Sequence, residues 1–162
     1  MKKITLITTL LLCLMMTLNA CSSYRDDVDV NDLTSEILNS VSTQGGYTAM
    51  DELFLSLEFA NPSLIESDVS EWMICASNSQ STVDEFGIFH VKDGEAETMK
   101  AICEAYIAKS KDRWVAQANY IASEHPKMEG AEIRIFGNYV VYTMLTEADK
   151  AIAFDAVESA LK

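Results

Sequence analysis

Histidine is scarce in this chain, and the common catalytic sequence motifs are missing. Only His90 and His125 occur among the 162 residues. A zinc-protease H-E-x-x-H pair, a phosphate-binding G-x-x-x-x-G-K-[ST] loop, a dinucleotide G-x-G-x-x-G turn and a G-x-S-x-G elbow do not occur. The sequence therefore does not indicate a metalloprotease, a nucleotide-binding enzyme or a serine hydrolase of these kinds. It indicates no cofactor and no metal site.

Basic residues are also few. The chain holds 12 lysines and arginines against 25 aspartates and glutamates, which gives a formal net charge of −13. Binding to nucleic acid, or lying flat on an anionic lipid surface, requires a basic face, so this charge argues against both. A solvated acidic surface that aids solubility is the simpler interpretation. An acidic face for a cationic ligand or a metal ion is the alternative.

The chain does have an apolar N-terminal segment that ends in a cysteine. Lys2 and Lys3 precede an almost unbroken apolar run, which the box Leu18–Cys21 (LNAC) closes. This order is typical of a bacterial lipoprotein signal peptide, cleaved between Ala20 and Cys21 so that Cys21 becomes the lipid-carrying N-terminus. The run is shorter than the roughly 20 residues of a membrane-spanning helix. An uncleaved anchor and a secretory peptide cut before an unmodified cysteine are the alternatives.

Cleavage at this box would leave an acidic protein on the outer, extracytoplasmic face of the cell membrane. Diacylglycerol on Cys21 carries two acyl chains, and two chains give the stable anchoring that one chain does not. Since two lysines leave with the leader, the formal charge becomes −15. We therefore expect residues 1–20 to be the signal peptide, residues 21–30 a lipidated acidic tether, and residues 31–162 a single domain.

Two further cysteines, Cys75 and Cys103, remain in the exported part of the chain. Both have apolar neighbours, in the stretches MICAS and AICEA, which favours two buried thiols. Because export permits disulfide formation, a bridge between these two cysteines is the alternative.

The apolar periodicity predicts an α+β domain. Helical spacing occurs in residues 31–43, 48–57, 93–114 and 146–162, and strand patterns occur in residues 69–76, 86–91, 133–135 and 139–145. After the N-terminal helices the order is β-β-α-β-β-α. This order predicts a four-stranded, mainly antiparallel sheet with helices packed on one face. The strand at 69–76 is apolar at both parities, so it is expected to be well covered or central in the sheet.

Capping and turn residues mark several ends of these elements. Asn31 or Asp32 is expected to cap the first helix, and Gln44-Gly45-Gly46 to end it. Thr48 and Asp51 form a capping-box-like pair for the second helix, as Thr146 and Asp149 do for the last. Breaks in the chain are expected at Asn61-Pro62 and in the loop containing Pro126 and Gly130, and a tight turn at Gly137-Asn138.

Several short stretches in the second half resemble a known family. DEFGIFHVKDGEAE (Asp84 to Glu97), a long helix, a connector around Tyr120 and GNYVVY (Gly137 to Tyr142) follow one another in the same order. The chain thus resembles the domain-of-unknown-function 4358 family, small lipoproteins found mostly in Gram-positive bacteria. The resemblance covers roughly residue 53 to the C-terminus. Since the family has no established activity, it implies fold and location only.

The pair Asp84-Glu85 is the feature of these stretches with chemical potential. The two carboxylates could face a cleft, but the simpler interpretation places Asp84 at the end of a turn and Glu85 on the solvent face. His90 is expected to be a partly exposed strand residue, and His125 a loop residue. No catalytic residue is assigned.

Three functions fit these observations. The first is a non-catalytic binding domain for an envelope protein or a small ligand. Tyr120, Tyr139 and Tyr142 could line its binding surface, although strand tyrosines are usually half-buried packing residues. The others are an accessory or assembly factor of a cell-envelope complex and an envelope hydrolase that uses carboxylates. A binding domain should show a concave pocket with converging polar groups. An enzyme should also show a carboxylate or histidine of perturbed pKa there, and an assembly factor a flat apolar patch.

Overall fold

The fold is built on one antiparallel sheet. A computed structural model describes residues 24–42, 46–79, 81–116 and 122–162. The strands lie in the order β1-β2-β3-β5-β4, and each neighbouring pair is antiparallel. Their bounds are β1 (Tyr47–Ala49), β2 (Val69–Ser77), β3 (Glu85–Val91), β4 (Glu132–Phe136) and β5 (Tyr139–Met144). β3 is therefore the central strand of a five-stranded sheet.

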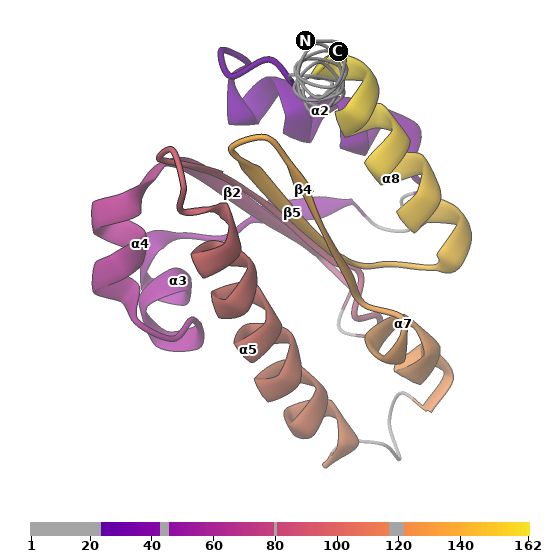
Figure 1. Ribbon diagram of the computed structural model, residues 1–162. Coiled ribbons are helices and arrows are strands. Elements are labelled where there is room, and N and C mark those ends of the chain that lie inside the picture. Colours follow the sequence, from indigo (N-terminus) through magenta and orange to yellow (C-terminus); the bar gives the residue numbers. More distant parts are fainter. Residues whose placement is uncertain (1–23, 43–45, 80, 117–121) are drawn as a thin grey trace, which may run out of the picture.

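Helices cover both faces of this sheet (Figure 1). One face carries α2 (Val30–Ser40) and α8 (Glu147–Ala160). The other carries α3 (Glu52–Glu58), α4 (Pro62–Asp68), α5 (Ala96–Val115) and α7 (His125–Glu129), which follows a 3-10 turn at Ala122–Glu124. The prediction of helices on one face is therefore wrong. Because β3 and β5 bury apolar side chains on both sides, both sides need a cover.

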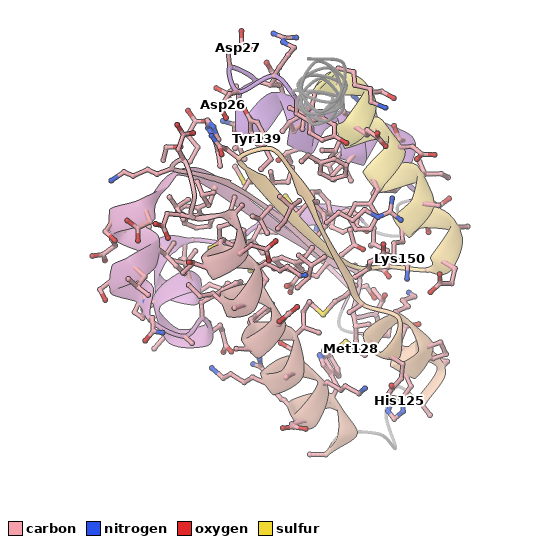
Figure 2. All side chains as sticks on the ribbon, in the orientation of Figure 1. Asp26, Asp27, His125, Met128, Tyr139 and Lys150 are labelled. Atoms are coloured by element: carbon pink, nitrogen blue, oxygen red, sulfur yellow. The ribbon has the colours of Figure 1, made fainter. Side chains whose placement is uncertain are left out.

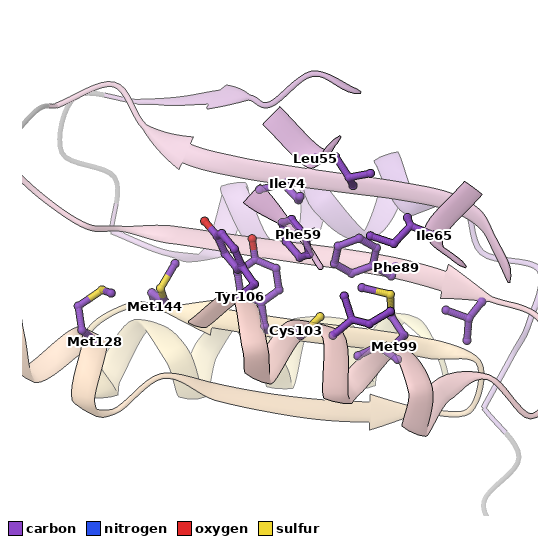
Figure 3. Packing of buried hydrophobic residues seen from close by; sticks show 14 of the residues in the cluster. Leu55, Phe59, Ile65, Ile74, Phe89, Met99, Cys103, Tyr106, Met128 and Met144 are labelled. Carbon is purple, nitrogen blue, oxygen red and sulfur yellow. The ribbon is translucent and has the colours of Figure 1, made fainter. Parts of the chain in front are cut away.

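The buried apolar side chains form two clusters, one on each side of the sheet. The cluster under α3, α4, α5 and α7 includes Phe59, Phe89 and Tyr106 (Figure 3). The cluster under α2 and α8 includes Phe86 and Phe154. Neighbouring residues of a strand point to opposite faces, and this alternation is what separates Phe86 from Phe89.

The two cysteines lie in different clusters. Cys75, on β2, belongs to the cluster under α2 and α8, and Cys103, on α5, belongs to the other. Both are free, buried thiols. The prediction of two buried thiols is therefore confirmed. The alternative, a bridge between the two cysteines, is wrong because the sheet lies between their side chains.

The sheet has a fifth strand because Tyr47–Ala49 pairs with β2 where a helix from Thr48 was expected. Asp51 is the N-cap of α3 instead, accepting a hydrogen bond from the amide of Phe54 at 2.9 Å. Asn61-Pro62 also does more than break the chain. Asn61 has a φ of +54°, and Pro62 begins α4, which was not expected. A three-residue strand and a seven-residue helix are too short to show a clear period.

The other element ends agree with the sequence to within a few residues. Thr146 caps α8 as predicted, and its hydroxyl oxygen accepts a hydrogen bond from the amide of Asp149. The first helix begins one residue earlier than expected, at Val30, and its cap is Asp29 rather than Asn31 or Asp32. It ends at Ser40, before the expected Gln44-Gly45-Gly46, of which residues 44 and 45 lie outside the described ranges. Residues 125–129, expected as a loop, form α7.

Residues 24–29, here called the N-terminal segment, lie against the domain. The amide of Val28 donates to the hydroxyl of Tyr139 at 3.0 Å, and that hydroxyl donates to the Val28 carbonyl at 2.7 Å. Asp26 contacts His90, and the ring of Tyr24 packs edge-on against Phe136. Figure 2 shows Asp26 and Tyr139 at the opposite end of the molecule from His125 and Met128.

The predicted signal peptide (residues 1–20), its cleavage residues Ala20 and Cys21, and the connector residue Tyr120 lie outside the described residues. Within the part of the chain that the structure describes, none of the helices has the length and apolarity needed to cross a bilayer.

Candidate functional site

Glu85 is a buried carboxylate at the first position of the central strand. Only 8% of its surface is exposed, and it shares a face of β3 with Gly87 and Phe89. Its Oε1 atom accepts hydrogen bonds from the hydroxyls of Tyr106 on α5 and Tyr142 on β5, both at 2.7 Å. The expected place of Glu85 on the solvent face is therefore wrong, because helices cover both faces of β3.

Gly87 makes room for one of these tyrosines. Gly87 and Tyr142 are direct partners across β3 and β5. A Cβ atom on residue 87 would lie 2.2 Å from Cε1 of the Tyr142 ring, far inside contact distance. The missing side chain therefore lets the ring lie over β3, so that its hydroxyl reaches Glu85 two residues away on the same face.

Aromatic packing holds the second tyrosine. The ring of Tyr106 stacks on Phe59 with centroids 4.2 Å apart and an interplanar angle of 12° (Figure 3). It also meets Tyr142 edge-on at 5.6 Å. Packing of this kind fixes the two ring planes. The two hydroxyls that bind Glu85 are therefore held in place before any ligand arrives.

Burial changes the acidity of all three groups. It raises the pKa of Glu85 to about 6, although hydrogen bonds from Tyr142 and Tyr106 act in the opposite direction. Burial, and then the nearby charge of Glu85, raises the pKa of both tyrosines. The two hydroxyls therefore stay protonated donors, and Glu85 changes charge near pH 6.

Glu85 lines a pocket of about 310 Å³ at one end of the sheet. This volume is at the lower end of the range for small-molecule sites. The walls come from α3, β2, the β2–β3 connection, β3, α5 and β5. The lining residues are Phe54, Ala76, Ser77, Ser79, Thr82, Val83, Asp84, Glu85, Tyr106, Ser110, Arg113, Trp114 and Met144.

The buried side chains of the pocket wall include two polar atoms without a hydrogen bond to a described residue. One is Oε2 of Glu85, since both tyrosine hydroxyls bind Oε1. The other is Oγ of Ser110, one helical turn after Tyr106 on α5 and only 2% exposed as a residue. Ser110 lies near the Tyr106 hydroxyl and works against the rise in the pKa of Tyr106, but the two groups form no hydrogen bond of normal geometry. Buried polar atoms usually have partners. The Oε2 atom of Glu85 therefore marks the part of the pocket where a polar ligand group would bind.

Asp84, the neighbour of Glu85, is held by a lysine. The Lys127 ammonium lies 2.6 Å from Oδ1 of Asp84, 2.7 Å from Oε2 of Glu124 and 3.1 Å from the hydroxyl of Thr82. An ammonium has three hydrogens, and these contacts use all of them. The arrangement ties the β2–β3 connection to α7 and leaves Lys127 without a donor for a ligand.

Arg113, at the edge of the pocket, is also engaged. Its guanidinium binds both carboxylate oxygens of Glu58 on α3, at 3.1 and 2.8 Å. Lys109 lies 3.1 Å from the same carboxylate. Partial burial by itself would raise the pKa of Glu58, but Arg113 and Lys109 hold this pKa below its ordinary value. The pair joins α3 to α5 on one side of the pocket.

The other residues singled out by sequence lie apart from the Glu85 pocket. His90 is partly exposed, as predicted, and stacks on Tyr139 with ring centroids 4.3 Å apart. Its Nε2 atom is 2.9 Å from Asp26, near the other end of β3. His125 is the first residue of α7. In the described ranges, histidine, cysteine and carboxylate side chains form no cluster of three or more that could hold a metal ion.

Sequence reasoning named Glu85 and Tyr142 separately and did not bring them together. It missed Tyr106 as a partner of Glu85, and it missed Ser110. Gly87 was the available signal, because a glycine inside an apolar strand often marks the close approach of another group.

Comparison with known protein families gives a match over the middle of the chain. The model of a family described as a domain of unknown function (DUF4358) matches residues 63–145, which are 83 of the 162 residues. The matched range contains Glu85, Gly87, Tyr106 and Tyr142, and leaves α2, α3 and α8 outside. No curated protein and no solved structure matches the chain.

Proposed function

The chain belongs to the DUF4358 family, and on that premise we propose that it is a membrane-anchored lipoprotein whose domain binds a ligand without transforming it. The leader supports the anchoring part, because a charged start, an apolar run and an Ala20-Cys21 end are typical of lipoprotein signals. In this proposal Cys21 carries the lipid, and the domain works on the outer face of the cell membrane.

The pocket around Glu85 carries the binding part of the proposal. It is concave and partly apolar, and the polar residues Glu85 and Ser110 both line it. Small-ligand sites typically combine an apolar wall with a few placed polar groups. The hydrogen bonds to Tyr106 and Tyr142 hold the carboxylate still, which favours recognition of one ligand geometry.

The same pocket gives less support to a hydrolase. The pKa of Glu85, near 6, would suit a general acid or base. However, a two-carboxylate mechanism needs a second acid free to act, and Asp84 is held by Lys127. A serine nucleophile needs a base in hydrogen-bond reach, and Ser110 has no such contact within the described residues. We therefore propose binding rather than catalysis.

A role as an accessory of an envelope complex is the second candidate. α3 exposes Leu53 and Leu57, at 63% and 66%, on one side of the helix and next to the pocket residue Phe54. Adjacent exposed leucines are the kind of surface that a protein partner covers.

A fragment screen on the full chain in detergent micelles tests the binding function. Binding should shift the amide NMR signals of pocket residues, including Ser77, Glu85 and Trp114. Ser110→Leu should abolish these shifts because the larger side chain fills the pocket. Ser35→Leu changes an exposed position of α2, on the opposite face of the sheet, and should leave the ligand-induced shifts unchanged. If no fragment shifts the pocket signals, the binding function is wrong.

Fractionation of cells and mass analysis test the anchor. The wild-type protein should be in the membrane fraction, begin at Cys21 and carry the mass of diacylglycerol. Cys21→Ala should give an unprocessed or released protein without lipid. A Cys21→Ala protein that is still mature and lipid-modified would contradict the assignment.

A further inference from the structure

We propose that the pocket around Glu85 selects ligands that present a protonated primary amine on a compact apolar body. The inference rests on the proposed binding function and adds the chemical class of the ligand. Three features of the pocket support it: a free carboxylate oxygen, cations that are already bound, and an apolar wall with aromatic side chains.

The free oxygen of Glu85 requires a donor. Oε1 already accepts hydrogen bonds from two tyrosine hydroxyls, so a ligand would meet Oε2. When the carboxylate is charged, Oε2 can accept hydrogen bonds but cannot donate them. A primary ammonium brings a positive charge and three N–H donors to this atom. A buried charge without an opposite charge is unfavourable, and the ligand would supply that opposite charge.

The bound cations argue against an anionic ligand. Arg113 binds both oxygens of Glu58, and Lys127 uses its three hydrogens on Asp84, Glu124 and Thr82. An anion would meet the charge of Glu85, and Arg113, the cation among the described residues of the pocket wall, already pairs with the carboxylate of Glu58. A neutral alcohol could donate one hydrogen bond to Oε2 but would bring no charge. Among these ligand classes, the amine fits the wall best.

The remaining wall describes the rest of the ligand. Phe54, Trp114 and Met144 contribute apolar surface, and aromatic rings also attract a nearby ammonium group. A quaternary ammonium would gain the same attraction but has no N–H to donate to Oε2. The volume of about 310 Å³ limits the ligand to a small apolar group next to the amine.

Binding of such a cation should depend on pH. The titratable and charged groups that act on Glu85 are Tyr106 and Arg113 from α5, Tyr142 from β5, and Glu58 from α3. The amine binds the charged carboxylate, so its affinity should be constant at the pH values where Glu85 is charged and the amine is protonated, and it should fall once Glu85 takes a proton.

Calorimetric titration of the full chain in detergent micelles with three matched probes tests the inference. The probes are phenethylamine, phenethyl alcohol and hydrocinnamate, which share the aromatic body and differ in the terminal group. At neutral pH the amine should bind about tenfold or more tightly than the alcohol, and the carboxylate should bind weakest. Lowering the pH below about 5 should weaken binding of the amine and leave the alcohol unchanged.

Two variants locate the effect. Glu85→Gln keeps the shape and an oxygen for the two tyrosines, and it should weaken amine binding by about tenfold or more. Glu97→Gln, an exposed acid in the first turn of α5, should not change it. Amide NMR signals outside the pocket should stay in place in both variants, which shows that the fold is kept.

The outcomes separate the two proposals. If the alcohol binds as tightly as the amine, or if Glu85→Gln leaves amine binding unchanged, the amine assignment is wrong and the binding function stands. If the three probes fail but other fragments occupy the pocket, the amine assignment is also wrong. If nothing binds in the pocket, both proposals are overturned.

Discussion

The wild-type protein should become less stable as the pH rises, because Glu85 then becomes charged. The Glu85→Gln variant should not show this decrease in stability. Burial raises the pKa of Glu85 from 4.5 to about 6, so the folded protein holds this proton more tightly than the unfolded chain does. For a group of this kind, stability is highest below the unfolded pKa. It decreases as the pH rises from 4.5 to about 6 and then stays lower. Glutamine does not titrate and should lack this decrease.

The size of the effect follows from the two pKa values. The difference between 4.5 and about 6 corresponds to ~2 kcal/mol in the free energy of unfolding. For a domain of this length, that corresponds to roughly 4–8 °C in Tm. Other carboxylates act in the opposite direction, since hydrogen bonds from cations keep the pKa of Glu58 and of Glu124 below its ordinary value, against partial burial. The effect of Glu85 must therefore be measured as a difference between variants.

Thermal unfolding followed by circular dichroism at about pH 4 and about pH 7.5 provides that difference. The Tm of Glu85→Gln minus that of wild type should be larger at the higher pH, by the amount given above. Glu97→Gln, which replaces an exposed acid, should not show this pH-dependent gain. If Glu85→Gln and wild type change equally with pH, Glu85 does not carry a raised pKa and the description of its burial is wrong.

Three further predictions concern packing and capping. Gly87→Ala should lower the free energy of unfolding by about 1–3 kcal/mol in urea titrations, because the new Cβ meets the Tyr142 ring. Thr146→Ala should lower it by about 1 kcal/mol in the same assay, through loss of the α8 cap. Cys75 and Cys103 should react with a thiol reagent only on unfolding, since both are buried and burial raises the pKa of each thiol.

Each of these three has a contradicting result. An unchanged stability of Gly87→Ala would show that the Tyr142 ring is not confined by β3. A neutral Thr146→Ala would show that another group satisfies the first turn of α8. Rapid labelling of either thiol in the folded protein would contradict its burial.

Local signals allowed much of the fold to be predicted. Thr146 marked the start of α8, and the Gly137-Asn138 turn joins two predicted strands, β4 and β5. Such signals act between residues near in sequence, so they can be read without knowing the fold. The apolar residues at both parities of β2 suggested a well-covered or central strand. β2 does pair with strands on both sides, but β3 is the central strand, and only Ile74 and Cys75 of β2 are buried.

The features that depend on distant contacts were not predictable in this way. Whether helices cover one face of the sheet or both depends on the packing of α8 beside α2, which is more than 100 residues away in sequence. No local sequence pattern predicts this packing. Glu85 illustrates the same limit. Its burial depends on the register that sets Gly87 opposite Tyr142 and on α5 placing Tyr106 above it. An acid at a strand end is usually exposed, and these two donors, together with the nearby charge of Arg113, reduce the cost of burying it.

The position of the N-terminal segment gives the protein a definite orientation if Cys21 carries lipid. Only residues 22 and 23 separate Cys21 from Tyr24, which already packs against Phe136. Asp26 contacts His90, and His90 lies five residues along β3 from Glu85, about 17 Å of strand. A domain attached so closely would turn the end of the sheet that carries His90 and Tyr139 toward the bilayer and open its pocket toward the extracellular side. Its ligands would then be molecules that arrive from outside the cell rather than lipids of the membrane that holds it.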